Sequence, residues 1–189
     1  LQHMLRRALG EARTLLLVEN DADRQWAGVG QDRALLMPGA GVDPAVFTAA
    51  PEPSSSPIIV GVVARLVWSK GIDLAVAAIQ RLRGEGVDVT LRIAGAIDPE
   101  NPERVTPEEL SRWRGMPGVE LVGAKHDINA FWADAHISCL PSRGGEGLPR
   151  SILEAASCGR PVVTTDAPGC GDFVLHGESG FVCPREDVD

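Results

Sequence analysis

Residues 136–165 read HISCLPSRGGEGLPRSILEAASCGRPVVTT and contain two apolar runs of strand length, at 136–140 and 161–165. A glycine-rich turn and a helical pattern over residues 149–157 lie between these runs. Pro149 suits the first turn of a helix, because the N–H group that proline lacks would have no helical partner there. A strand, a helix and a second strand in this order predict a βαβ unit with parallel strands.

The same alternation continues on both sides of this unit. Further apolar runs that we expect to form strands are residues 58–65, 89–94, 119–122 and 180–183. The remaining helical patterns cover residues 71–84, 107–114, 127–133 and 172–175. Runs that are apolar almost throughout are typical of strands buried on both faces. The sequence therefore predicts an α/β fold with a Rossmann-like parallel sheet sandwiched by helices.

The beginning of the chain departs from this pattern. Residues 15–18 (LLLV) and 34–37 (ALLM) have the composition of buried strands. A short helix is expected between them at residues 22–27, with Asp21 as its N-cap. Two strands are too few for a stable sheet, so these segments are interpreted as part of a larger domain.

A linker follows these two strands. Residues 38–57 are rich in Gly, Pro, Ala and Ser and show no periodicity. We therefore expect residues 1–56 to be the remnant of a preceding N-terminal domain with its interdomain linker. Residues 57–189 are then expected to be a second domain whose C-terminal helices are truncated.

Length and charge exclude several classes of protein. The chain has 189 residues, with 18 Lys and Arg against 26 Asp and Glu, and a formal net charge of −8. This acidic balance disfavours nucleic-acid binding, which needs a positively charged face. No apolar run approaches the roughly 20 residues of a membrane-spanning helix, and the N-terminus lacks the apolar segment of a signal peptide. We therefore expect a cytoplasmic protein.

The cysteines are spread through the second half of the chain, at Cys139, Cys158, Cys170 and Cys183. They form no C-x-x-C pair, and each lies in or beside an apolar segment, so we expect reduced and mostly buried thiols. A zinc site built from them and nearby histidines is the less favoured alternative, because no two of these residues have the spacing of a ligand pair.

Two glutamates accompany the glycine-rich turn and its helix. Glu146 lies in the turn, and Glu154 lies about a turn and a half into the helix. The N-terminus of a helix attracts phosphate, and a carboxylate can accept hydrogen bonds from the two hydroxyls of a vicinal diol. The pair is therefore compatible with a nucleotide-sugar site. The alternative is that both are ordinary solvated carboxylates, and spacing alone favours it.

Two basic residues follow the strand expected at residues 58–65. Arg65 ends that run, and Lys70, one of two lysines in the chain, precedes the next helix. In a parallel sheet, ligands bind beyond the carboxyl ends of the strands, where both cations could accept an anionic diphosphate. Trp68, between them, could border the same crevice. The alternative is a helix start with both basic side chains in solvent.

Four motifs together resemble a known family. They are R-L-x-x-x-K-G at residues 65–71, E-G-L-P-R-S-I-L-E-A at 146–155, C-G-R-P-V-V-T-T-D-A-P-G-C at 158–170 and H-G-E-S-G-F-V at 176–182. In this order they closely resemble the C-terminal donor-binding domain of GT-B retaining glycosyltransferases. The similarity is to glycosyltransferase family four, of the capsule and exopolysaccharide type. Upstream, E-N-D-A-D-R and M-P-G-A-G-V-D-P-A-V-F resemble the end of the N-terminal domain and the linker of that family.

The resemblance implies a role for each of several residues. Arg65 and Lys70 would bind the donor diphosphate, and Glu154 would bind the ribose hydroxyls. Glu146, with the backbone N–H groups of Gly147 and Leu148, would hold the transferred sugar. The base would lie near Gly95 and near the segment that ends at Lys125. Glu146, Arg65 and Lys70 would be the catalytic set.

The resemblance also implies an activity. A sugar would pass from a nucleotide-sugar, expected to be UDP-linked, to a glycan or a polyprenyl-diphosphate-linked acceptor, with retention at the anomeric carbon. Neither a metal nor another cofactor is expected, since the nucleotide-sugar is a co-substrate. The missing domain would hold the acceptor, so the present chain alone should not catalyse sugar transfer. The same domain could bring the enzyme to the inner face of the membrane.

Two alternatives remain at this point. One is an epimerase or sugar-phosphate synthase of the same fold that acts on UDP-sugars. The other is a non-catalytic module that binds a nucleotide-sugar. The Asp21-Ala-Asp23 sequence formally matches a D-x-D metal motif, but its position before a short helix favours a capping role.

Overall fold

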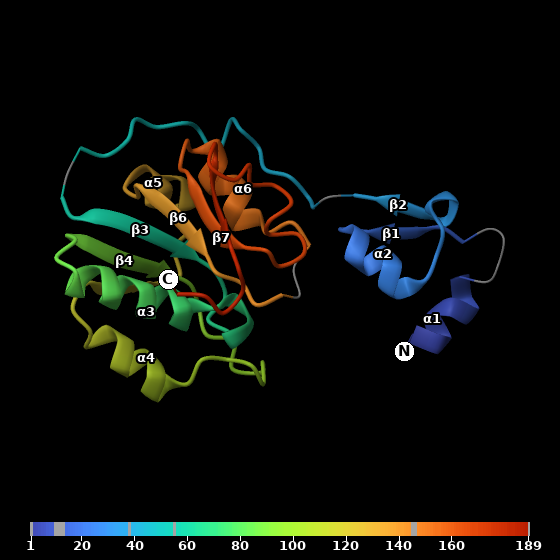
Figure 1. Ribbon diagram of the computed structural model, residues 1–189, viewed down its shortest axis with the longest axis horizontal. Coiled ribbons are helices and arrows are strands. Elements are labelled where there is room, and N and C mark those ends of the chain that lie inside the picture. The colour runs from blue at the N-terminus through green and yellow to red at the C-terminus, as the bar shows by residue number, and fades with distance from the viewer. Residues whose placement is uncertain (1, 10–13, 38, 55, 145–146, 189) are drawn as a thin grey trace.

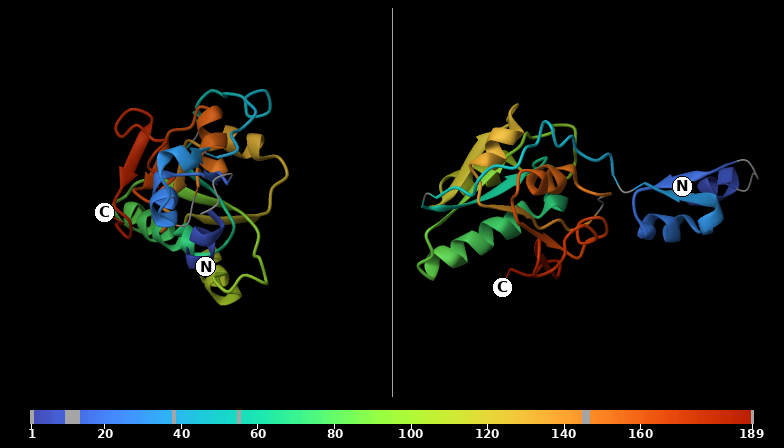
Figure 2. Two further views of the ribbon diagram at one scale, coloured as in Figure 1. Left: turned by 90° about the vertical axis from the view of Figure 1, so that its right-hand side faces the viewer. Right: turned by 90° about the horizontal axis from the view of Figure 1, so that it is seen from above.

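The computed structural model describes residues 2–9, 14–37, 39–54, 56–144 and 147–188. Within these residues a large parallel sheet forms the body of the molecule, and a small unit built from the N-terminal segments lies beside it (Figures 1 and 2). The large sheet contains β3 (Ile58–Val63), β4 (Val89–Ala94), β5 (Val119–Gly123), β6 (Ile137–Leu140), β7 (Val162–Thr165) and β8 (Gly180–Cys183). These six strands are ordered β5-β4-β3-β6-β7-β8.

Helices cover both faces of this sheet, as Figure 1 shows. They are α3 (Ile72–Gly84), α4 (Pro107–Arg114), α5 (Ile128–Ala133) and α6 (Arg150–Ser157). Alternation along β3 explains the two layers: Val62 belongs to the apolar cluster that includes residues of α3 and α4, whereas Ile59 belongs to the cluster that includes residues of α5 and α6. The predicted Rossmann-like sheet between two helical layers is therefore confirmed.

The centre of the sheet joins two segments that are distant in sequence. Strands β3 and β6 pair over Val60–Ile137 and Gly61–Ser138. At the end of this pair, the Ile59 N–H donates to His136 Nδ1 at 3.0 Å, and the His136 N–H donates to the Ile59 carbonyl at 2.9 Å. Gly61 is needed here because a Cβ at this position would lie 2.8 Å from the ring of Trp132 on α5.

One predicted helix is wrong. Residues 172–175 form turns and irregular backbone instead. The Asp172 side chain accepts a hydrogen bond from the Gly169 N–H at 3.1 Å, which stabilises a turn. Val174 is buried, but Phe173 and Leu175 are 39% and 63% exposed, and one buried side chain is too little to stabilise a helix of this length.

The N-terminal segments form the small unit. It contains α1 (Gln2–Leu9), β1 (Leu16–Val18), α2 (Asp21–Ala27), a 3₁₀ turn (Gln31–Arg33) and β2 (Ala34–Leu36). The strands β1 and β2 pair in parallel. The N-cap of α2 is Asn20, whose Oδ1 accepts the Asp23 N–H at 2.8 Å, so the prediction of Asp21 as the cap is wrong by one residue.

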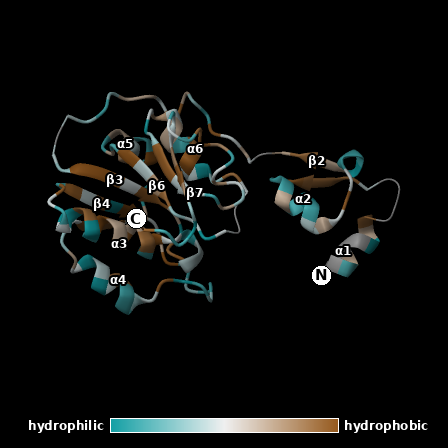
Figure 3. Cartoon of the chain, viewed as in Figure 1, coloured by the Kyte–Doolittle hydropathy of each residue, from teal (hydrophilic) through white to brown (hydrophobic). Residues whose placement is uncertain are grey.

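The apolar side chains of β1 and β2 are more exposed than the sequence predicts. Leu17 and Leu35 are 58% and 60% exposed, and Figure 3 shows both strands as hydrophobic. A two-stranded sheet has too little surface to bury both faces of such strands. The predicted burial is therefore confirmed for Val18 and wrong for Leu17 and Leu35, and the assignment of both strands is confirmed.

The linker between β2 and β3 lies against the layer of α5 and α6. Its described residues contain no helix or strand, as predicted. Phe47 is 7% exposed and belongs to the apolar cluster of Trp132. The Ser157 hydroxyl donates to the Phe47 carbonyl at 2.6 Å, and Arg160 Nη2 donates to the Ala50 and Pro51 carbonyls at 2.8 and 2.9 Å. These contacts fix the second half of the linker to the body of the molecule.

Candidate functional site

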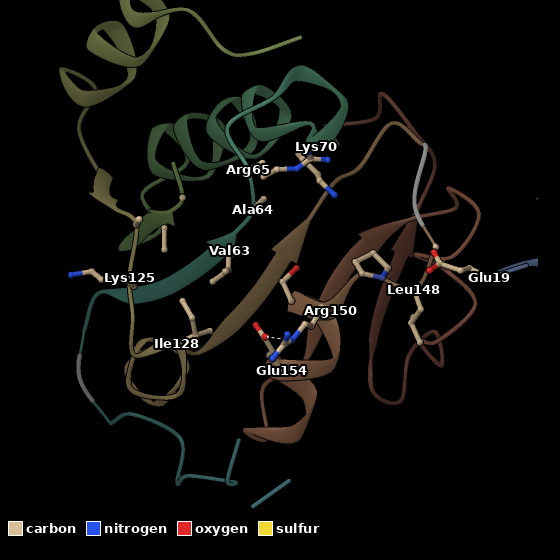
Figure 4. A pocket seen from close by; sticks show the side chains of 16 residues that line it. Glu19, Val63, Ala64, Arg65, Lys70, Lys125, Ile128, Leu148, Arg150 and Glu154 are labelled. Atoms are coloured by element: carbon tan, nitrogen blue, oxygen red, sulfur yellow. Dashed lines mark ion pairs between the residues drawn. The ribbon is translucent and has the colours of Figure 1, made fainter. Parts of the chain in front are cut away.

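The order of the strands creates a crevice at one edge of the large sheet. From β3 the chain passes outward to β4 and β5, then returns to place β6 on the other side of β3. The loops after β3 and β6 therefore lead in opposite directions, and such a switch point leaves a crevice beyond the carboxyl ends of the strands. A cleft of about 470 Å³ is found there (Figure 4).

Loops from both halves of the sheet line this cleft. The first half contributes Val63, Ala64, Arg65, Lys70, Ala94, Gly95, Ala124, Lys125 and Ile128, and the second half contributes Gly147, Leu148, Pro149, Arg150, Ser151 and Glu154. The N-terminal unit adds Glu19. Almost every predicted site residue is therefore at this one cleft, although these residues are far apart in sequence. The exception is Glu146, which lies outside the described residues.

The basic side chains of the first half lie near the end of β3. Arg65 and Lys70 point into the same end of the cleft, whereas Lys125 lies at the other end (Figure 4). The Leu66 N–H donates to the Ala96 carbonyl at 3.1 Å, which keeps the backbone after β3 beside the backbone after β4. Trp68 is not among the lining residues, because its ring packs edge-on against buried Trp113, with the centroids 6.2 Å apart.

Gly95 permits the close approach of these two segments. A Cβ at this position would lie only 2.0 Å from the Ala64 carbonyl oxygen. Replacing Gly95 by alanine should therefore push the two loops apart, lower the midpoint of thermal unfolding and reshape this part of the cleft. Gly84→Ala is a matched control, because a Cβ at Gly84 meets nothing within 4 Å. Equal unfolding midpoints for the two variants would contradict this reading of Gly95.

Glu154 lies at the floor of the cleft. The residue is 7% exposed, and its Oε1 forms an ion pair with Arg150 Nε at 2.9 Å. Burial raises the pKa of Glu154, while the charge of Arg150 and the hydrogen bond from it act in the opposite direction. A carboxylate that is largely withdrawn from water and open to a cleft is suited to accept hydrogen bonds from ligand hydroxyls.

Two charged lining residues were missed by the sequence reasoning. Arg150 begins α6 and lies four residues before Glu154, so the i, i+4 spacing of the pair was a usable signal. Glu19 had no such signal, because it comes from the end of β1, far away in sequence. Its carboxylate lies against Gly147, where a Cβ would be 1.6 Å from Glu19 Oε2. A side chain at position 147 would therefore displace Glu19.

The charge of the cleft differs from that of the whole chain. Its described lining includes four cations, Arg65, Lys70, Lys125 and Arg150, and two carboxylates, Glu19 and Glu154. The chain as a whole carries a formal net charge of −8. A cluster of cations in a concave surface raises the local concentration of anions. The cleft is therefore suited to an anionic ligand that also carries hydroxyl groups.

Other chemical groups lie outside this cleft. Within the part of the chain that the structure describes, no three or more His, Cys, Asp or Glu side chains are grouped so that they could hold a metal ion. The four cysteines are free thiols, with Cys158 and Cys170 buried and the other two half-buried, as predicted. No helix among the described residues is both long and apolar enough to span a membrane.

The chain is similar to a known protein family and to several named proteins. The family model described as "Glycosyl transferases group 1" matches residues 57–189. A putative colanic acid biosynthesis glycosyltransferase, WcaL of Salmonella typhimurium, is 35% identical over 133 residues, which are 67% of this chain and 32% of that protein. WcaL of Escherichia coli is 34% identical over 78% of this chain and 38% of its own length. The chain thus spans about a third of these relatives.

A solved structure shares the arrangement of the whole chain. The crystal structure of Anabaena HepE in complex with UDP and glucose has a TM-score of 0.80 and 23% identity, covering 100% of this chain and 55% of that one. The N-terminal unit, the linker and the large sheet are therefore all matched by one known fold.

Proposed function

We propose, from the premise that the chain belongs to the group 1 family of glycosyl transferases, that its cleft binds a nucleotide-sugar donor for transfer to an acceptor hydroxyl. The observation that supports the proposal most is the meeting of Arg65, Lys70, Gly95, Lys125, Gly147, Leu148 and Glu154 around one cleft. A cleft with cations at one end and a buried carboxylate in its floor fits a diphosphate joined to a ribose.

The donor is proposed to lie along the cleft with its diphosphate near Arg65 and Lys70. The N-terminus of α6, which begins at Arg150, adds a partial positive charge near the same ligand. The ribose hydroxyls would bind Glu154, and the base would lie towards Gly95 and Lys125. UDP is the proposed nucleotide, and its presence in the HepE complex supports this choice.

The proposed reaction exchanges one C–O bond for another. The acceptor hydroxyl oxygen bonds to the anomeric carbon, and the bond from that carbon to the diphosphate oxygen breaks. The electron pair of the broken bond remains on the diphosphate, which takes the proton of the acceptor hydroxyl. Arg65 and Lys70 stabilise the negative charge that develops on the leaving group. Retention of anomeric configuration and independence of a metal ion are part of this proposal.

The acceptor side is proposed to come from another part of the enzyme. Residues 1–56 would belong to the N-terminal acceptor domain and its linker, and residues 57–189 to the donor-binding domain. The names of the WcaL relatives support a role in cell-surface polysaccharide synthesis, with a saccharide or polyprenyl-diphosphate-linked acceptor. We place the enzyme in the cytoplasm, at the inner face of the membrane. The WcaL relatives are named as glycosyltransferases, which makes an epimerase or a silent binding module the less favoured alternative.

Isothermal titration of this chain with UDP, GDP and the corresponding nucleotide-glucose compounds tests the proposal. We expect UDP and UDP-sugars to bind, and GDP to bind more weakly. If none of these ligands binds at millimolar concentration, the proposal of a donor site in this cleft is contradicted. Binding of GDP in preference to UDP would instead overturn the choice of base.

The raised pKa of Glu154 predicts how binding depends on pH. The ionised carboxylate accepts hydrogen bonds from the ribose hydroxyls, so the ligand binds preferentially to the deprotonated form of Glu154. Because the pKa in the free protein lies above the ordinary value of about 4.3, protonation begins at a higher pH and competes with the ligand. The affinity for UDP should therefore fall as the pH is lowered towards that raised pKa.

The isosteric variant Glu154→Gln isolates this effect. Glutamine does not titrate, so the variant keeps only the pH dependence that comes from the phosphate groups of UDP itself. The measurement is the Kd for UDP at several pH values between 5 and 8 for both proteins. If Kd changes with pH in the same way in both proteins, Glu154 does not cause the pH dependence of UDP binding.

A further inference from the structure

Arg143 lies just outside the cleft, in the loop that leads from β6 to α6. Its Nη1 and Nη2 donate to Oδ1 and Oδ2 of Asp73 at 2.7 and 2.8 Å. Asp73 is in the first turn of α3, the helix that follows Lys70. This paired geometry matches the planar fork of a guanidinium to a carboxylate. The loop after β6 is thereby joined to the start of α3.

The same loop binds the backbone of the turn that carries Lys70. This 3₁₀ turn is Trp68–Lys70. The Trp68 carbonyl accepts a hydrogen bond from Arg143 Nη1 at 2.7 Å, and the Ser69 carbonyl accepts the Arg143 N–H at 2.8 Å and the Ser142 hydroxyl at 3.1 Å. Two successive carbonyls immediately before Lys70 are therefore held by residues 142–143.

The residue after Lys70 is held against the same loop. Gly71 has a φ of +64°, and a Cβ there would lie 1.9 Å from the Pro141 carbonyl oxygen. Contacts from residues 141–143 thus lie on both sides of Lys70 in sequence. The remaining Arg143 nitrogen, Nε, donates to Glu186 Oε1 at 2.7 Å, so each guanidinium nitrogen has a partner. A lysine at position 143 could not reproduce this set of contacts.

The guanidinium of Arg143 keeps its positive charge at neutral pH. Its hydrogen bonds to Asp73 and Glu186 raise a pKa that is already high. Its side chain is 26% exposed and that of Asp73 is 28% exposed, so the pair is partly shielded from solvent. A partly buried, bidentate pair holds its geometry better than an exposed one.

We propose that Arg143 is a positioning residue for donor binding, which fixes the turn of Lys70 so that the ammonium group faces the diphosphate. The inference rests on the proposed function of the cleft. Arg143 itself does not line the cleft, and it acts on the ligand through Lys70. Loss of Arg143 should leave Lys70 present but free to adopt other directions.

A double-mutant cycle with UDP tests this role. Lys70→Ala should weaken UDP binding by about 10- to 150-fold. Arg143→Gln should weaken it by roughly tenfold, and the double variant should bind no more weakly than Lys70→Ala alone. Arg143→Lys should not restore the affinity, because it lacks the fork. Additive losses in the double variant would overturn the inference, since they would mean that Arg143 acts independently of Lys70.

Arg92→Gln is the matched control. Arg92 is 25% exposed and pairs with Glu120 at 2.8 Å, a comparable partly buried ion pair that does not contact the Lys70 turn. We expect this variant to lose stability without losing affinity for UDP. If Arg143→Gln does not fold, Asp73→Asn provides the second arm, because it removes the ion pair and leaves the contact of Arg143 with Trp68. Unchanged affinity in Asp73→Asn would then contradict the inference.

The outcomes separate the inference from the function on which it rests. If the unaltered chain does not bind UDP, both the proposed function and the positioning role fail. If the chain binds UDP and Lys70→Ala weakens binding but Arg143→Gln does not, only the positioning role fails.

Discussion

Replacing Trp132 by alanine should lower the free energy of unfolding by about 3–5 kcal/mol, the usual cost of truncating a large aromatic side chain in a core. Trp132 is 0% exposed and packs edge-on against Phe131, with the ring centroids 5.1 Å apart. Its ring also fills the space above Gly61, so its loss would open a cavity between α5 and the centre of the sheet. Urea unfolding followed by circular dichroism measures the change.

A second variant separates volume from hydrogen bonding. Trp132 Nε1 is buried and has no hydrogen-bond partner in the structure. Trp132→Phe removes this unsatisfied donor while it keeps an aromatic ring, so it should cost clearly less than the alanine variant. Trp26→Ala, at a position that is 51% exposed, should change stability little. Equal effects at positions 26 and 132 would contradict the assignment of Trp132 to the core.

Replacing Lys70 by alanine should weaken the binding of UDP by about 10- to 150-fold, which corresponds to the roughly 1.5–3 kcal/mol of a charge-assisted hydrogen bond. Lys70 and Arg65 face the end of the cleft where we propose the diphosphate (Figure 4). In the proposed reaction, removal of the ammonium group takes away one of the two side chains that stabilise the negative charge of the diphosphate and leaves Arg65. Isothermal titration gives the change in Kd, and turnover by the full-length enzyme should fall with it.

Lys125→Ala is the matched control for this prediction. It removes the other lysine of the chain from the opposite end of the same cleft. The base proposed to bind there is uncharged, so the loss of the ammonium group at this end should weaken binding much less. If Lys125→Ala had the larger effect, the direction in which the donor lies in the cleft would have to be reversed.

The large sheet could be predicted from sequence because its strands are buried on both faces. Val89–Ala94 and Gly180–Cys183 were predicted with the bounds that the structure has, and the other four differ by one or two residues. Apolar composition is sufficient in such strands, since neither face needs to be polar. The placement of Arg65 and Lys70 then followed from a general property of parallel sheets, which place ligands at their carboxyl edge. Gly95 and Lys125 were predicted from the resemblance to the family.

The features that could not be predicted from the sequence depend on contacts between distant segments. Glu19 reaches the cleft because the N-terminal unit lies beside Gly147, and no local pattern encodes that contact. The exposure of Leu17 and Leu35 was missed for the opposite reason: their composition is that of a core, but the described residues of the small unit leave both side chains more than half exposed. The helix predicted at residues 172–175 was too short for periodicity to be distinguished from a turn.

The order of the strands also bears on how the molecule folds. The strands β3, β4 and β5 follow one another in sequence and pair with their nearest neighbours in the chain. In contrast, β3 pairs with β6 only when Ile59 and His136, which are 77 positions apart, come together. Contacts of such separation form late and slow a folding reaction. The cleft is built from loops on both sides of this β3–β6 junction, so it becomes complete only after the junction closes. A nucleotide that bridges these loops should therefore slow the separation of the two halves and protect the amides of Ile59 and His136 from hydrogen exchange.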